Sequence, residues 1–165
     1  MKLNLGCGDK KRDGYVNVDV CGNPDQRYDL SIFPWPWPDG SADEVYSEHF
    51  LEHVQDYERT VLEIHRVLKA GGLLWFRVPH HRAPMATWHL HRWSFSTYTP
   101  ILLCTEVPYQ WGGRKLFEQI ELKLNYPYTP AGLRQVITWL ANLSPYRWDW
   151  LGLPVEEIEF RARKC

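Results

Sequence analysis

Two glycines and one aspartate near the start of the chain have the types and spacing that ligand chemistry needs. The run Leu3-Asn4-Leu5-Gly6-Cys7-Gly8 leads from a short apolar strand into a tight glycine turn, and Asp19 ends a second short apolar run. A glycine turn lets the backbone approach a ligand closely. The pattern predicts a nucleoside ligand lying across the strand ends of an open α/β sheet.

The charged residues around this turn indicate which nucleoside would bind there. The third glycine of a dinucleotide fingerprint is missing, and Asp19 comes 11 positions after Gly8, whereas that fingerprint has its acidic residue roughly 20 positions on. Carboxylates just past predicted strand ends would repel a pyrophosphate; they are Asp9, Asp19, Asp29 and Glu48. They suit a ligand that carries a cation and no phosphate, and S-adenosylmethionine is such a ligand.

A second motif has the spacing of metal ligands. The run His49-Phe50-Leu51-Glu52-His53 spells H-x-x-E-H, an inverted zinc-protease motif that would place both histidines on one helical face. No third ligand stands at a diagnostic spacing. We therefore assign no metal ligand and expect Glu52 and His53 to make a structural hydrogen bond or to face solvent.

A histidine-rich segment follows, with three interpretations: a polar basic loop, a general base that deprotonates an acceptor, or a metal site. Its histidines are His80, His81, His89 and His91, with Arg82 and Arg92 beside them. We expect His80 and His81 to face the cavity because they directly follow a predicted strand. Aromatic residues in the same segment are either core or a stacking platform for a sugar or base; they are Trp88, Trp93, Phe95 and Tyr98.

The elements that must position these residues alternate along the chain. Helices are predicted from Glu48 onward and over 56–69 and 130–143, with Gly71-Gly72 ending the second. The segment between residues 8 and 14 is too short and polar for a usual crossover helix. Strands are predicted over 2–5, 15–20, 28–30, 42–46, 73–78, 117–124 and 155–163. This order predicts a single α/β domain over residues 1–165.

Bulk composition narrows the class of protein. The formal net charge of the 165-residue chain is −1, which argues against a broad nucleic-acid footprint. No run approaches the ~18 apolar residues needed to span a bilayer. The four cysteines are scattered, and we expect no signal segment, because the first predicted strand begins at Lys2. We expect a cytoplasmic protein with no membrane partner.

The ordered motifs resemble those of a class I S-adenosylmethionine-dependent methyltransferase of the compact bacterial and archaeal kind. Besides the first glycine turn, the matching runs are 14–19, Pro36-Trp37-Pro38-Asp39-Gly40-Ser41-Ala42-Asp43, 49–53 and 63–72. The resemblance covers residues 1 to about 80, as a cofactor half, and is faint over 81–165, which would be the acceptor half. It implies a Rossmann-like fold with a mostly parallel sheet, an antiparallel C-terminal strand and a first crossover helix that is reduced or missing.

The resemblance also implies roles for individual residues. Asp19 would accept both ribose hydroxyls, Asp29 and Leu30 would contact adenine, and Glu48 and His49 would lie near the methionine end. The full set of expected cofactor contacts is Leu5, Gly6, Cys7, Gly8, Asp19, Val20, Asp29, Leu30, Glu48 and His49. Candidates for a catalytic base are His49, His80 and His81.

The favoured function is methyl transfer from S-adenosylmethionine to an oxygen or nitrogen nucleophile of a small-molecule or glycan acceptor. Two alternatives stay open. One is a non-catalytic module that binds the same nucleoside and acts with a partner, since no N-terminal cover precedes the first strand. The other is a metal-dependent hydrolase built on the histidines. A homodimer also stays open, because a partner subunit could close the site.

Overall fold

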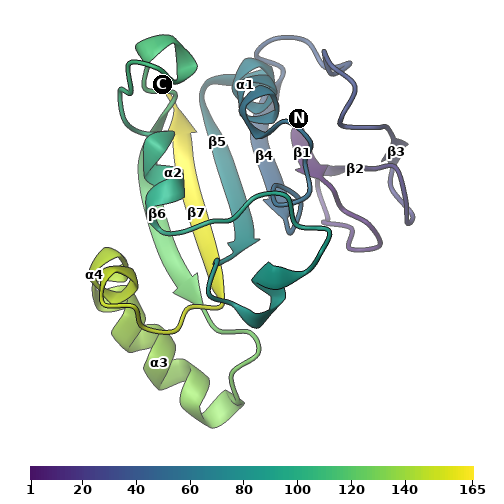
Figure 1. Ribbon diagram of the computed structural model, residues 1–165. Coiled ribbons are helices and arrows are strands. Elements are labelled where there is room, and N and C mark those ends of the chain that lie inside the picture. The colour runs from purple at the N-terminus through teal and green to yellow at the C-terminus, as the bar shows by residue number, and fades with distance from the viewer.

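The computed structural model describes residues 1–165, and one seven-stranded sheet runs through the whole of it (Figure 1). The strand order is β3-β2-β1-β4-β5-β7-β6. The neighbours from β3 to β5 are parallel, whereas β7 runs antiparallel to both β5 and β6. This confirms the predicted mostly parallel sheet with an antiparallel C-terminal strand. The strands are β1 (Lys2–Leu5), β2 (Val16–Asp19), β3 (Gln26–Arg27), β4 (Ala42–Glu48), β5 (Leu68–Pro79), β6 (Phe117–Asn125) and β7 (Glu157–Lys164).

Four α-helices accompany the sheet. The longest two are α1 and α3, and α3 and α4 pack together beside β6 (Figure 1). None of the helices has the length and hydropathy of a membrane-crossing segment. The helices are α1 (Tyr57–Val67), α2 (Tyr98–Leu102), α3 (Ala131–Leu143) and α4 (Pro145–Trp150), with 3₁₀ turns at Pro84–Thr87 and Trp111–Gly113.

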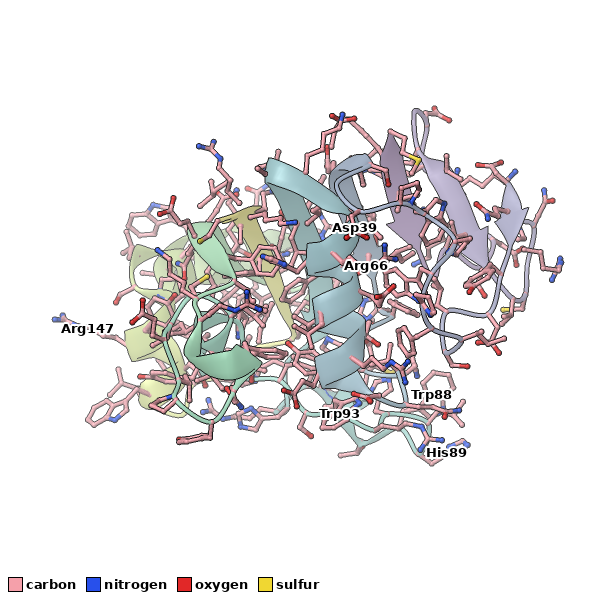
Figure 2. All side chains as sticks on the ribbon, turned by 90° about the horizontal axis from the view of Figure 1, so that it is seen from above. Asp39, Arg66, Trp88, His89, Trp93 and Arg147 are labelled. Carbon is pink, nitrogen blue, oxygen red and sulfur yellow. The ribbon has the colours of Figure 1, made fainter.

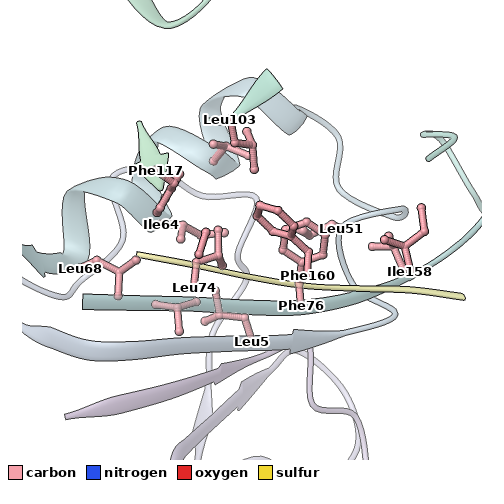
Figure 3. Close-up of a cluster of buried hydrophobic side chains, with 14 of the residues drawn as sticks. Leu5, Leu51, Ile64, Leu68, Leu74, Phe76, Leu103, Phe117, Ile158 and Phe160 are labelled. Carbon is pink, nitrogen blue, oxygen red and sulfur yellow. The ribbon is translucent and has the colours of Figure 1, made fainter. Parts of the chain in front are cut away.

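The hydrophobic core lies between α1 and one face of the sheet (Figure 3). Side chains of a strand alternate between its two faces, so Leu5 of β1 and Phe76 of β5 both turn toward the core. On α1, Val61, Ile64 and Val67 are buried at helical spacing. Asp56 caps this helix, since its side chain accepts the Arg59 N–H at 2.9 Å.

The opposite face of β1 and β2 lacks the first crossover helix, as predicted. Asn4 and Asn17 stand side by side on this face, and the Asn4 Nδ2 donates to the Asn17 Oδ1 at 2.7 Å. Both side chains also bind the 6–15 loop: Asn4 donates to the Lys10 carbonyl, and Asn17 accepts the Arg12 N–H at 2.8 Å. Asparagine therefore alternates with leucine and valine in these strands because a loop backbone, rather than an apolar helix, covers them.

The same loop covers part of β4 and β5 through one arginine. The Arg12 guanidinium lies 4.2 Å from the Tyr46 ring centroid and 4.3 Å from that of Trp75. Stacking of this kind attracts a cation to the face of an aromatic ring. Arg12 thus occupies the place over the sheet where a crossover helix would otherwise pack.

The proline-rich segment before β4 is held by two side chains of α1, Arg66 and Glu63, and Glu63 accepts the Trp35 N–H at 2.8 Å. Arg66 donates to the Trp35 and Trp37 carbonyls and pairs with Glu63 and Asp39, the latter at 2.7 Å. Figure 2 shows Arg66 and Asp39 next to each other beside this helix. This anchoring fixes residues 35–39 against α1.

Three predictions about the elements are wrong. Gly71 and Gly72 do not end a helix, because α1 already ends at Val67 and both glycines lie inside β5. No helix begins at Glu48; residues 49–55 form turns, because His49 adopts a left-handed backbone with φ of 52° and the His53 N–H bonds to the Phe50 carbonyl. His49 and His53 therefore do not share a helical face. The brief strand predicted over 28–30 lies instead at Gln26–Arg27, where the backbone pairs with β2.

Candidate functional site

A cleft of about 250 Å³ opens at the carboxyl ends of β1 and β2. In an open parallel sheet the loops at this end form the ligand crevice. Five of the expected cofactor residues line it, namely Gly6, Asp19, Val20, Asp29 and Leu30. The structure therefore brings these five together, from three separate segments of the chain.

The two glycines of the first turn need to be glycine for different reasons. Gly6 has φ of 67°, and a Cβ there would lie 2.5 Å from the Phe50 ring. Gly8 has φ of 51°, and a Cβ there would meet no protein atom within 4 Å. The Gly8 backbone is thus left-handed and open on the side where a ligand could approach it.

Asp19 is held in place by backbone donors. Its Oδ2 accepts the Gly8 N–H at 2.8 Å, and its Oδ1 accepts the Cys21 N–H at 3.0 Å. Partial burial acts to raise the pKa of this carboxyl, but the N–H groups of Cys21 and Gly8 outweigh it and the net pKa lies below the usual value. Asp19 is therefore ionised at neutral pH, with lone pairs left to accept hydroxyl groups.

The charge of the cleft matches a cationic nucleoside. Its lining includes the carboxylates of Asp19, Asp29 and Asp56 and no lysine or arginine. Leu30, Phe50 and Val54 supply apolar walls suited to a base. These residues fit a donor with a sulfonium and a ribose diol, and would repel a phosphate-bearing cofactor.

Two expected cofactor residues lie elsewhere. Glu48 does not line the cleft; it accepts the Tyr46 hydroxyl at 2.6 Å and pairs with Lys10 at 3.5 Å. His49 is held between two carboxylates, with Nδ1 3.1 Å from Glu52 and Nε2 2.9 Å from Glu157. These hydrogen bonds, Glu157 first, raise the pKa of His49 to about 9. Both ring nitrogens therefore carry protons at neutral pH.

His80, the second candidate base, is fully buried. Its Nδ1 accepts the Arg82 N–H at 3.2 Å, and its Nε2 lies 3.1 Å from the Asp149 Oδ1. Burial lowers the pKa of His80 to about 4, although Asp149 acts against this. Its exposed fraction is 0 %, so it does not face the cavity as the sequence predicted.

His81 is the third candidate and is exposed. Its Nδ1 lies 3.2 Å from the Phe95 carbonyl, which fixes the proton on that nitrogen. The Nε2 is left free to accept a proton from an acceptor. Among the three candidates, His81 alone has both exposure and a free ring nitrogen. It is not among the residues that line the donor cleft, so the prediction that it faces this cavity is wrong.

Three further expected contacts flank the cleft without lining it. Leu5 is in the core, Cys7 is buried, and Gly8 touches the site through its bond to Asp19. Sequence reasoning missed Tyr28, Ser31, Phe33, Phe50, His53, Val54, Gln55, Asp56 and Thr60 as lining residues. Four of them lie in the turns after β4, where a helix was expected, so the residues there that face the cleft could not be assigned.

Comparison with known sequences gives one family match. A family model described as a methyltransferase domain matches residues 17–76, which hold Asp19, Asp29 and the turns after β4. No curated protein matches the chain.

Solved structures share the fold at low sequence identity. An S-adenosylmethionine-dependent methyltransferase from Mesorhizobium loti aligns with a TM-score of 0.58 and 18% identity, over 98% of this chain and 89% of that one. A Thermotoga maritima enzyme described as a possible histamine N-methyltransferase aligns with a TM-score of 0.62 and 16% identity, over 99% and 82%. A chain from a Haloferax volcanii complex of a methyltransferase with its Trm112 activator aligns with a TM-score of 0.56 and 18% identity, over 98% and 81%.

Proposed function

We propose that the chain is a class I S-adenosylmethionine-dependent methyltransferase that methylates an oxygen or nitrogen nucleophile of a small-molecule or glycan acceptor. The match of a methyltransferase-domain model to residues 17–76 and the fold shared with solved methyltransferases support this proposal. The observation that carries this proposal is the acidic cleft with Asp19 at the end of β2. When bound, S-adenosylmethionine supplies an electrophilic methyl group on a sulfonium. The protein then has to align the acceptor, exclude water and remove a proton.

Each donor-binding residue would contact the part of S-adenosylmethionine that its own chemistry suits. Asp19 would accept the ribose hydroxyls, because a charged carboxylate makes strong paired hydrogen bonds to a diol. Leu30 and Phe50 would enclose the base, and the open Gly8 backbone would border the methionine portion. His81 would take the acceptor proton through its free Nε2.

A second cleft supports the acceptor class. It has a volume of about 550 Å³ and is lined by Trp139 together with amide, hydroxyl and guanidinium groups, among them Asn125, Thr138 and Arg77. Trp139 is 63% exposed. An open indole face beside such donors suits a sugar. Glu157 lines this cleft and binds His49, whose neighbour Phe50 lines the donor cleft.

The test is donor affinity measured by calorimetry. We expect Asp19→Ala to weaken S-adenosylmethionine binding about 100-fold, because two charge-assisted hydrogen bonds contribute roughly 3 kcal/mol. Glu106→Gln, an exposed carboxylate with no ion-pair partner, is the matched control and should bind as the wild type does. Wild-type affinity in a folded Asp19→Ala variant would contradict the proposal.

One observation favours the alternative of a binding module that acts with a partner. The outer side of α3 exposes apolar residues at helical spacing, namely Leu133, Val136, Leu140 and Leu143. An exposed apolar helix face is typical of an interaction surface. A chain that sediments as a monomer and methylates an acceptor on its own would exclude this alternative.

A further inference from the structure

Three side chains that the proposed reaction does not use meet at the rim of the donor cleft. Glu52, His53 and His91 each offer a ligand atom, and these atoms lie within 4.8 Å of one another. Glu52 and His53 come from the turns after β4, and His91 comes from the histidine-rich loop. The sequence alone does not identify His91 as a third ligand, because only the path of the folded loop brings it near Glu52 and His53.

Two buried polar atoms of this group lack protein partners. Glu52 is 0 % exposed, and its Oε2 has no hydrogen-bond partner. The buried Nδ1 of His91 has none either. An unpaired buried carboxylate oxygen is costly, so such atoms call for a partner of another kind.

The remaining atoms of the first two residues are bound in the way that metal ligands usually are. The Glu52 Oε1 lies 3.1 Å from the Nδ1 of His49, which donates to it. The His53 Nδ1 lies 3.3 Å from the Leu90 carbonyl, which leaves His53 Nε2 free. A histidine that ligates a metal characteristically donates its other N–H to a carbonyl, and a ligating carboxylate accepts from a neighbour.

The backbone holds the two segments together at this point. The Glu52 carbonyl accepts the Arg92 N–H at 2.8 Å, and Trp93 Nε1 donates to the Val54 carbonyl at 2.7 Å. Trp88 packs edge-on against both His53 and His91, with ring centroids 5.7 and 5.6 Å away. Figure 2 shows Trp88 and Trp93 on the same side of the molecule as the start of α1. The group is thus partly shielded from solvent.

We propose that Glu52, His53 and His91 bind a divalent transition-metal ion such as Zn²⁺, which ties the histidine-rich loop to the rim of the donor cleft. Two imidazoles and one carboxylate suit zinc and its first-row neighbours, whereas Mg²⁺ and Ca²⁺ prefer oxygen ligands. Bonds of about 2.1 Å in a tetrahedron place ligand atoms roughly 3.4 Å apart, so the separations in the group need to shorten by up to about 1.4 Å. The site does not depend on the proposed methyl transfer.

Titration of tag-free, chelator-treated protein with ZnCl₂ in a calorimeter tests this site. We expect one ion per chain for the wild type, and His91→Gln to weaken binding by about 100-fold or more, since loss even of an outer hydrogen bond costs 10–100-fold. Titration with CoCl₂ gives a second readout, because a Co²⁺ ion in such a site absorbs visible light. His89→Gln is the matched control, since His89 is an exposed histidine of the same loop and lies outside the group.

Each outcome bears on the site directly. One-to-one uptake that is lost in His91→Gln and kept in His89→Gln supports it. Absence of Zn²⁺ uptake by the wild type overturns it, as does wild-type affinity in the His91→Gln variant. Equal losses in both variants would also overturn it, because the ion would then bind the loop elsewhere. His91 is partly exposed, so circular dichroism of the variant should match that of the wild type.

Discussion

At the scale of single residues, the sequence predicts well where a side chain lies when the residue stands at the end of a strand. Asp19 and Gly6 line the cleft as expected because the strands before them are short and clearly apolar. His49 differs, because its partner Glu157 lies 108 residues away and its own backbone is left-handed. Neither the distant partner nor the left-handed backbone can be inferred from the five residues 49–53, so the surroundings of His49 could not be predicted.

The three candidate bases can be separated by substitution of His81. We expect His81→Gln to lower kcat by about 10²–10⁴-fold, the usual contribution of a positioned base. Donor affinity should stay unchanged, because His81 does not line the donor cleft. The measurement is release of S-adenosylhomocysteine with a panel of sugars and small alcohols, beside calorimetry. Full activity of the variant would contradict this assignment, because another group would then accept the proton.

At the scale of elements, the chain replaces a helix by a loop that polar side chains hold. The alternation of Leu-Asn-Leu and Val-Asn-Val predicted strands correctly, and the short polar segment after Gly8 predicted the missing helix. The asparagines gave no clue to their partners, since the loop path decides which carbonyl they meet. Beyond Pro79 the apolar periodicity predicted β6, α3 and β7, whereas the short helices α2 and α4 have too few residues to show a pattern.

The loop that replaces the helix should depend on Asn17. This buried side chain accepts from Asn4 and the Arg12 N–H, and its own amide donates to Asp25. We expect Asn17→Ala to lower the free energy of unfolding by about 2–4 kcal/mol, since several buried groups lose a partner. Urea denaturation measures the change. Lys11→Ala removes an exposed ion pair to Asp25 as a control and should cost under about 1 kcal/mol.

At the scale of the whole molecule, His65 and His80, whose pKa values are strongly lowered, make the protein less stable in acid, whereas the raised pKa of His49 acts in the opposite direction. Burial is the main cause that lowers the pKa of His65 to about 4, and the positive charges of Lys164 and Arg114 lower it further. Burial also lowers the pKa of His80 to about 4. An unfolded chain binds these protons near pH 6.5. Stability from both groups is therefore complete above pH 6.5 and is lost as the pH falls toward 4.

Thermal or urea unfolding at two pH values measures this coupling. Between pH 7 and pH 5 we expect His65 to account for a loss of about 1–2 kcal/mol in the free energy of unfolding. His65→Gln should lose correspondingly less over the same interval, although its stability at pH 7 can differ. A variant with the same pH slope as the wild type would contradict this assignment.

The place of β7 in the sheet has a consequence for biosynthesis. This strand is the last of the seven along the chain, yet it pairs with both β5 and β6 and brings Glu157 to His49. A ribosome delivers the chain from its N-terminus, so β5 and β6 emerge with no strand to join them until residues 157–164 leave the exit tunnel. The nascent polypeptide therefore cannot complete its sheet while the first 156 residues are translated. During that interval one edge of β5 and the edges of β6 are exposed, and this is when we expect chaperones to be needed.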